Sequence, residues 1–114
     1  MAIEKIYAQL SCSDIVNSAK WFQTLFGRAP DARPMNGLVE WRHEKQAGFQ
    51  LFENPGDAGR GTMTLIVSAL QKEHERLTEA GMAPPAIEPA DSVSLVRLRD
   101  PDGNLVVLAQ PGRA

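Results

Sequence analysis

Asp100-Pro101-Asp102-Gly103-Asn104 is the stretch that decides the fold, because it joins two runs that alternate like β-strands, residues 93–99 and 105–110. Asp at the first position of a type I turn, Pro at the second and Gly at the fourth suit the backbone of that turn, and Gly103 can take a positive φ at little cost. The stretch therefore predicts a β-hairpin, and the pattern around it occurs twice in the chain.

Composition restricts the class of protein. The chain has 114 residues, 43% of them hydrophobic, and a formal net charge of −2, which suits a single domain over residues 1–114 with a modest core. Its interspersed charges form no basic field, so we expect no nucleic acid and no membrane as a partner. The N-terminal residues enter a strand pattern without a signal peptide, which predicts a cytoplasmic protein. The single cysteine, Cys12, excludes an intrachain disulfide and is expected to fill the core.

The first repeat unit is predicted over residues 4–53. Apolar residues alternate in its strands and recur at helical spacing in its helix, for which Asp14 is the expected N-cap and Gly27 the expected end. Its predicted elements are a strand, a helix, a short extended piece and two more strands, over residues 5–12, 15–26, 28–37, 38–43 and 48–53.

The second unit is predicted over residues 62–110, after a glycine- and proline-rich linker over residues 54–61. Ser68 and Gln71 match a capping box that opens a helix over residues 69–80, closed by Gly81. Its strands are expected over residues 62–67, 84–89, 93–99 and 105–110. A unit of this kind cannot bury its own apolar face, so we expect an α+β fold in which two βαβββ units pack as a pseudo-symmetric cup.

A known family shares these features. The order β-α-β-β-β twice, the helix ending Trp21-Phe22-Gln23-Thr24-Leu25-Phe26-Gly27, the glycines at 59 and 61 before a strand ending at Val67, and the Asp-Pro-Asp-Gly-Asn hairpin together resemble the vicinal oxygen chelate superfamily. That superfamily comprises glyoxalases, bleomycin-resistance proteins and extradiol dioxygenases, and it includes both metal-dependent enzymes and proteins that sequester drugs. The resemblance covers nearly the whole chain and also implies a homodimer.

The resemblance implies a place for a metal. Enzymes of the superfamily hold a divalent ion with His, Gln or Glu from the first and last strand of each unit, where the ion polarises two substrate oxygens. Aligning the helix starts and the last hairpins brings to these places Tyr7, Thr62, Leu51 and Val107. A register shift brings instead Gln9, Thr64, Gln50 or Glu53, of which only Glu53 is a strong ligand. We therefore expect no metal site and no evident cofactor, with a displaced divalent metal as the alternative.

The open faces of the sheets are expected to bind a small molecule, because they combine apolar side chains with a few hydrogen-bonding groups. The predicted ligand-binding residues are Tyr7, Gln9, Trp41, Leu51, Glu53, Thr62, Thr64, Arg97 and Val107. Trp41 and Arg97, taken as matched positions of the repeat, offer a stacking surface and a cation for an aromatic or anionic ligand. The alternative for these two residues is a structural role, in which Trp41 packs between the units and Arg97 pairs with Glu40 or Glu53.

Two classes of function follow. The favoured one is a metal-free small-molecule binder similar to the bleomycin-resistance type, which sequesters or senses its ligand. The alternative is an enzyme, a glyoxalase-like lyase or isomerase or a dioxygenase, with displaced metal ligands or with acid–base chemistry by Tyr7 or Glu53, and a weaker third reading is an accessory domain. We assign no catalytic residue from the sequence.

Overall fold

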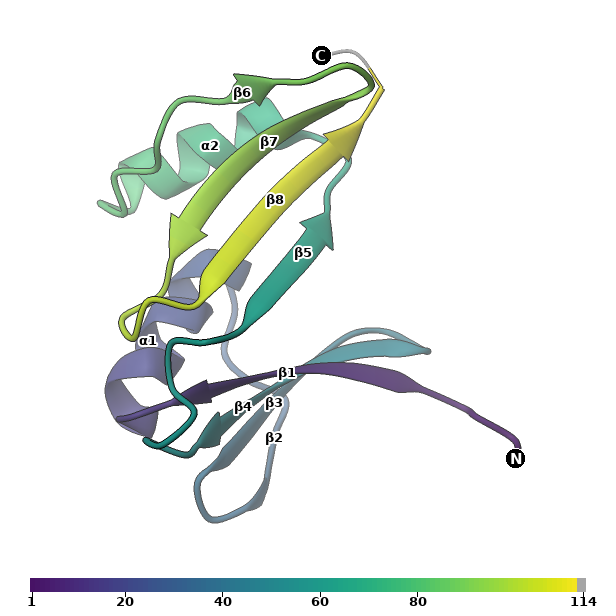
Figure 1. Ribbon diagram of the computed structural model, residues 1–114, viewed down its shortest axis with the longest axis vertical. Helices are drawn as coiled ribbons and strands as arrows, with labels where there is room; N and C mark the ends of the chain where they lie inside the picture. Colours follow the sequence, from purple (N-terminus) through teal and green to yellow (C-terminus); the bar gives the residue numbers. More distant parts are fainter. Residues whose placement is uncertain (113–114) are drawn as a thin grey trace. The chain divides into compact units, whose positions relative to one another are not determined.

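The computed structural model describes residues 1–112, which form two compact units. The first unit comprises Met1–Gly61 and the Asp100–Asn104 turn, and the second comprises Thr62–Arg99 and the residues from Leu105 onward. Each unit is a mixed four-stranded sheet with one helix, in the order βαβββ (Figure 1). The predicted α+β fold class is therefore confirmed.

The first unit follows the predicted order closely. Its elements are β1 (Ile6–Cys12), α1 (Ile15–Phe26), β2 (Ala32–Met35), β3 (Leu38–Glu44) and β4 (Ala47–Glu53). The sheet order is β1-β4-β3-β2, with β1 parallel to β4 and the other pairs antiparallel. The Asp14 side chain accepts hydrogen bonds from the first-turn N–H groups of α1, and Gly27 ends the helix with a φ of 73°. Both predicted caps are confirmed.

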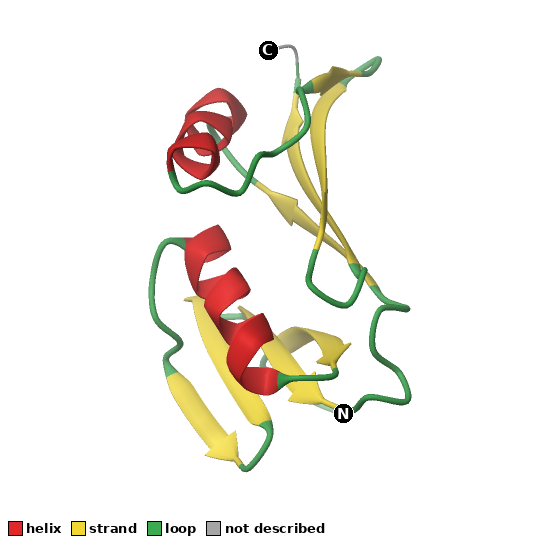
Figure 2. Ribbon diagram, turned by 90° about the vertical axis from the view of Figure 1, so that its left-hand side faces the viewer, coloured by secondary structure: helices red, strands yellow, loops and turns green. Residues whose placement is uncertain are grey.

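In the first unit, α1 lies against one face of the sheet (Figure 2). An aromatic cluster forms the core between them. The ring centroids of Phe22 and Phe49 are 4.7 Å apart, and those of Phe26 and Trp41 are 5.4 Å apart. Phe22, Trp41 and Phe49 are each 0% exposed. Burial of such large apolar rings supplies most of the stabilisation available to a unit of this size.

The second unit repeats the order with a more polar helix. Its elements are β5 (Thr62–Ile66), α2 (Leu70–Glu79), β6 (Glu88–Pro89), β7 (Val93–Arg99) and β8 (Leu105–Pro111), in the sheet order β5-β8-β7-β6. Leu70 and Leu77 are the buried residues of α2. Neither helix in residues 1–112 is long and apolar enough to cross a lipid bilayer.

The predicted capping box of the second helix is wrong. Ala69, not Ser68, occupies the N-cap position, and no side chain of this local sequence caps the helix. Instead, the side chain of Gln110, forty residues away on β8, accepts a hydrogen bond from the Leu70 N–H at 2.8 Å. A tertiary contact has replaced the local cap that the sequence pattern suggested.

The predicted turn between β7 and β8 is confirmed. The Gly103 N–H donates to the carbonyl oxygen of Asp100 at 2.9 Å, and Gly103 has a φ of +96°. The Asp100 carboxylate, 5% exposed, accepts hydrogen bonds from the backbone N–H groups of Asp102 and Asn104. The turn is therefore held by its own side chains.

The contacts of Asn104 explain why the Asp100–Asn104 turn belongs to the first unit. Asn104 is 0% exposed; its amide nitrogen donates to the carbonyl oxygen of Ser11 at 2.9 Å, and its amide oxygen accepts from the Gly61 N–H at 2.8 Å. Asp102 accepts from the N–H of Ser13 at 3.1 Å. The turn thus ties together the end of β1 and the residue before β5.

Candidate functional site

One face of each sheet carries no helix, and we call it the open face. On the first sheet, α1 packs on the side of Trp41 and Phe49, so their strand neighbours point to the open face. The register places Gln9 of β1 opposite Gln50 of β4, and Gln50 opposite Glu40 of β3. A polar row therefore crosses three neighbouring strands of the first open face.

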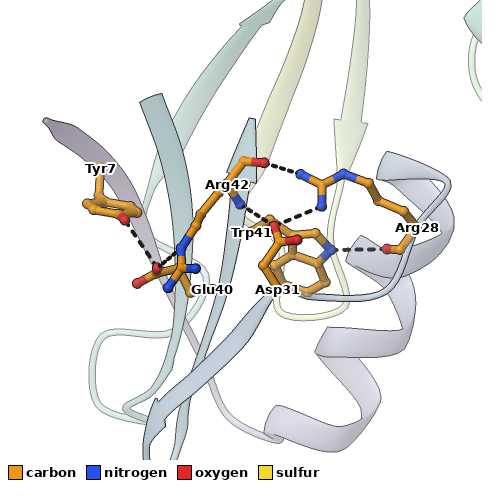
Figure 3. Close-up of polar contacts among 6 residues, drawn as sticks. All are labelled: Tyr7, Arg28, Asp31, Glu40, Trp41 and Arg42. Carbon is orange, nitrogen blue, oxygen red and sulfur yellow. Dashed lines mark hydrogen bonds and ion pairs between the residues drawn. The ribbon is translucent and has the colours of Figure 1, made fainter. Parts of the chain in front are cut away.

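Glu40 is the centre of this row. The residue is only 5% exposed, and its carboxylate accepts hydrogen bonds from the Tyr7 hydroxyl at 3.1 Å, Arg42 Nε at 2.9 Å and Gln50 Nε2 at 3.1 Å. Gln9 Nε2 donates in turn to Gln50 Oε1 at 3.0 Å. Figure 3 shows Tyr7, Glu40 and Arg42 gathered on one side of β3. We call these five residues the Glu40 network.

The surroundings of Glu40 keep its carboxylate charged. The hydrogen bond from Gln50 is the main cause that lowers the pKa of Glu40, and the hydrogen bonds from Arg42 and Tyr7 act in the same direction. Burial opposes them but is outweighed. At neutral pH Glu40 is therefore an anion that orients its three donors, and not a carboxylic acid that could give a proton to a substrate.

Gly48 provides the space for the Tyr7 ring. These two residues are register partners on β4 and β1, and a side-chain carbon at Gly48 would overlap the ring of Tyr7. The ring therefore lies against bare backbone, which holds the phenolic hydroxyl within reach of Glu40.

The second open face has a different chemistry. Thr64 of β5 lies opposite Val107 of β8, which lies opposite Arg97 of β7. Arg97 Nε lies 3.1 Å from Glu88 Oε2 of β6, a partner that the sequence analysis did not name, and both side chains are about half exposed. Thr62 lies two residues before Thr64 on the same exposed edge strand. The four predicted site residues of the second unit therefore lie on one face of its sheet, and one of them, Arg97, is a cation.

Trp41 and Leu51 lie on the helix side of the first sheet and not on its open face. Both are 0% exposed, and the Trp41 indole N–H donates to the carbonyl oxygen of Arg28 at 3.0 Å, as Figure 3 shows. Glu53 serves the start of α1, because its Oε2 accepts from the Ile15 N–H at 2.9 Å. We leave these three predicted residues out of the site that we propose below.

A one-residue error in the repeat alignment explains these placements. Leu51 is the expected counterpart of Val107, whereas the sheet registers make Gln50 its counterpart. Successive residues of a strand face opposite sides, so an error of one residue exchanges the two faces. Glu40 and Arg42 were missed as site residues for this reason, although the alternation of apolar Val39 and Trp41 with charged Glu40 and Arg42 was a signal for them.

Two other titratable side chains of the first unit have shifted pKa values. Cys12 is 0% exposed, as expected for a core residue, and burial is the main cause that raises the pKa of its thiol to about 11. The ring of His43 lies 4.6 Å from that of Phe26, and burial against its surroundings lowers the pKa of His43. Neither residue is arranged as a nucleophile or a general base.

Comparison with known proteins agrees with this fold. The family model described as the glyoxalase-like domain matches residues 7–109. A search of curated proteins finds no match. Among solved structures, a glyoxalase/bleomycin resistance protein from Catenulispora acidiphila DSM 44928 is 26% identical with a TM-score of 0.86, over 94% of this chain and 97% of that one.

Two further similar structures are described as binding proteins, one for bleomycin and one for an antibiotic. A bleomycin-binding protein in complex with bleomycin is 20% identical, with a TM-score of 0.73 over 94% of this chain and 98% of that one. The antibiotic-binding protein TnmS3 from Streptomyces sp. CB03234 is 20% identical, with a TM-score of 0.78 over 98% of this chain and 99% of that one. Because the family model spans both βαβββ units, the chain belongs to the glyoxalase-like domain family, within the vicinal oxygen chelate superfamily.

Proposed function

We propose that this protein binds a small aromatic molecule with hydrogen-bonding groups, and that the Glu40 network is its anchor. The observation that carries the proposal is an ionised, nearly buried carboxylate with three donors on a sheet face that its helix leaves open. Small-molecule sites typically combine apolar surface with a few fixed polar groups of this kind.

Stability alone is a poor reason for such a network. Removing the Glu40 carboxylate from water costs free energy that offsets much of its attraction to the half-exposed Arg42, so an apolar residue of similar size would stabilise the sheet about as well. What the network adds is orientation, because Glu40 fixes the positions of the Tyr7 hydroxyl and the Arg42 guanidinium. Fixed donors are useful where a ligand must be held in one pose.

The accessible groups favour an aromatic ligand. The Arg42 side chain is 53% exposed, Tyr7 is half-buried beside it, and Gln9 is exposed at the edge of the same face. A guanidinium plane and a phenol ring both stack on aromatic rings, and the Gln9 amide can bond a polar substituent. Glu40 balances the charge of Arg42, so this face favours an aromatic compound over a strongly anionic one.

The similar structures support the same class of ligand. Two proteins with this fold are named for binding antibiotics, one of them bleomycin itself. At 20% identity, these structures show that the fold is shared. We propose that this chain also binds an antibiotic-like compound. Thr62, Thr64, Arg97 and Val107 stay predicted contacts on the second open face.

We further propose that binding needs no divalent metal. The places that the superfamily uses for metal ligands hold Tyr7 and Gln50 in the first unit and Thr62 and Val107 in the second, which together provide no carboxylate or imidazole. Within residues 1–112, no three His, Cys, Asp or Glu side chains gather into a metal site. Such a donor set does not fit a catalytic divalent ion.

Binding can be mapped by ¹H–¹⁵N NMR of the full chain during titration with metal-free bleomycin and then with a panel of aromatic antibiotics. We expect a compound of this class to shift the signals of Gln9, Arg42 and Gln50. Tyr7→Phe removes one hydroxyl from the network and should weaken binding about three- to tenfold, the usual effect of one hydrogen bond. Gln23→Ala, at an exposed site on α1, is the matched control and should bind normally.

Shifts confined to other parts of the chain, or none with any compound, would contradict the proposal. Elemental analysis after incubation with Mn²⁺, Fe²⁺, Ni²⁺ and Zn²⁺ and desalting tests the second part, for which we expect far less than one ion per chain. A stoichiometric ion would favour the alternative enzyme function. A homodimer in the cytoplasm is part of the same proposal, and light scattering on a sizing column measures the dimer directly.

A further inference from the structure

A cavity of about 510 Å³ lies in the second unit, on the helix side of its sheet. The start of α2, Ile87 and strands β7 and β8 line it, one side opens to solvent, and it shares no residue with the Glu40 network. Its volume is in the range of about 300 to 1,000 Å³ that is typical of small-molecule sites. The lining residues that matter for its chemistry are Leu70, Gln71, Lys72, Ile87, Ser94 and Gln110.

The start of α2 presents free hydrogen-bond donors at this cavity. Ala69 at the N-cap offers no side-chain acceptor, and Gln110 takes only the Leu70 N–H. The N–H groups of Gln71 and Lys72 have no acceptor within residues 1–112. Unpaired N–H groups and the positive end of the helix dipole together favour an anion at this position.

Ser94 is an independent sign of a ligand. It lies next to Gln110 in the sheet register, lines the cavity and is only 5% exposed, yet its hydroxyl has no hydrogen-bond partner among the described residues. No polar side-chain atom sealed from solvent in residues 1–112 lacks a partner, so the hydroxyl of Ser94 opens to the cavity. Nearly buried polar groups are almost always bonded, and this one lacks only a partner inside the cavity.

The remaining groups specify the chemistry of that partner. The amide nitrogen of Gln110 and the ammonium of Lys72 are further donors at the cavity. The one carboxylate there, that of Glu75, already accepts from Gln71 Nε2 at 3.2 Å. Leu70 and Ile87 add an apolar wall. We propose that this cavity binds a small organic carboxylate, with its charged group at the start of α2 and beside Ser94, and its hydrocarbon part against Leu70 and Ile87.

This site does not depend on the proposed function. It lies in the other unit, on the opposite side of a sheet, and its donors suit an anion, whereas the first open face suits an aromatic compound with balanced charge. Each of the two sites can therefore exist without the other.

The test is an NMR titration of the full chain with benzoate, and with benzamide as the neutral molecule of the same shape, at constant pH and ionic strength. We expect benzoate to shift the amide signals of Gln71 and Lys72 saturably, and benzamide to do so at least tenfold more weakly. Ser94→Ala should weaken benzoate binding about three- to tenfold, since it removes one hydrogen bond. Ser92→Ala, in the exposed loop before β7, is the control and should bind as the parent does.

A second variant separates binding from folding. Gln110→Glu keeps an acceptor for the Leu70 N–H but places a negative charge at the cavity, so it should abolish benzoate binding while the fold is retained. Equal effects of benzoate and benzamide, shifts outside the cavity, or unchanged affinity in Ser94→Ala would each overturn the proposal. Thermal unfolding of both variants confirms that the comparison is made on folded protein.

Discussion

Glu40 on β3 and Arg97 on β7 occupy equivalent positions in the two sheets and carry opposite charges. In the first sheet, Gln50 of β4 lies between Glu40 and the first strand of the unit, β1. In the second sheet, Val107 of β8 lies in the same way between Arg97 and β5. Glu40 is nearly buried and has three donors, whereas Arg97 is half-exposed and pairs with Glu88. The repeated fold has therefore kept its geometry while its two open faces diverged in chemistry.

Glu40 should make stability depend on pH. Because folding lowers the pKa of Glu40, its contribution is complete above the pKa of the unfolded chain, about 4.3 for Glu, and is lost as the pH falls through the folded value. Glu40→Gln should therefore be less stable than the parent at pH 7, and the difference should shrink below about pH 5. Urea unfolding from pH 3 to 7 measures this, with Glu44→Gln as an exposed control; parallel profiles of parent and Glu40→Gln would contradict the expectation.

Asn104 should be among the most sensitive positions for stability. Asn104→Ala removes hydrogen bonds to Ser11, Gly61 and Asp100 from a fully buried site, and should cost about 3 kcal/mol of unfolding free energy. Chemical denaturation measures the loss. Asn17→Ala, on the exposed side of α1, is the control and should be unchanged or slightly more stable, since Ala favours helix. A loss below 1 kcal/mol at Asn104 would show that the turn is not a tie of this kind.

Gly103→Val tests the backbone of the turn. No atom lies within 4 Å of a side chain added at Gly103, so the cost comes only from holding a β-branched residue at a φ of +96°. We expect a loss of about 1 to 3 kcal/mol. Gly56→Val is the matched control, because Gly56 is a loop glycine that does not have a positive φ. Equal stability of the two variants in thermal unfolding would mean that the turn tolerates side chains.

The thiol of Cys12 should be unreactive in the native protein. It is fully buried and its pKa is raised to about 11, so at pH 8 only about one thiol in a thousand is ionised. Titration with a disulfide reagent should therefore modify Cys12 only after guanidinium is added. Rapid modification of folded protein would show that the core around β1 opens readily.

The fold could be predicted because its signals are local. Asp14 and Gly27 bound the first helix by their own side-chain chemistry, and Gly103 suits one turn and few alternatives. The start of the second helix could not be predicted in this way, since its acceptor is Gln110, which lies far away in the sequence. Local patterns identify caps only where the neighbouring residues provide them.

The candidate site depends on strand register, and the register expected for the β3–β4 hairpin was wrong by one residue. The β3–β4 hairpin has an irregularity between Arg42 and Glu44, whereas β7 and β8 are joined by the Asp100–Asn104 turn. Arg42 pairs with Gly48 and Arg99 pairs with Leu105, so the two hairpins have the same length. Matching Trp41 to Arg97 and Leu51 to Val107 therefore displaced both strands of the first hairpin by one place. Trp41 and Leu51 were thereby assigned to the open face. Of the other predicted residues, Tyr7, Gln9, Thr62, Thr64 and Arg97 lie at exposed or half-buried positions, whereas Val107 is buried.

The contacts of the Asp100–Asn104 turn also bear on how the chain folds during synthesis. A ribosome releases the strands and helix of the first unit well before it makes Asn104, which lies 43 residues after its partner Gly61 and 93 after Ser11. Until then, the carbonyl of Ser11 and the N–H of Gly61 lack the side chain that joins them. The nascent first unit can collapse around its aromatic core, but it reaches its final stability only when translation is almost complete.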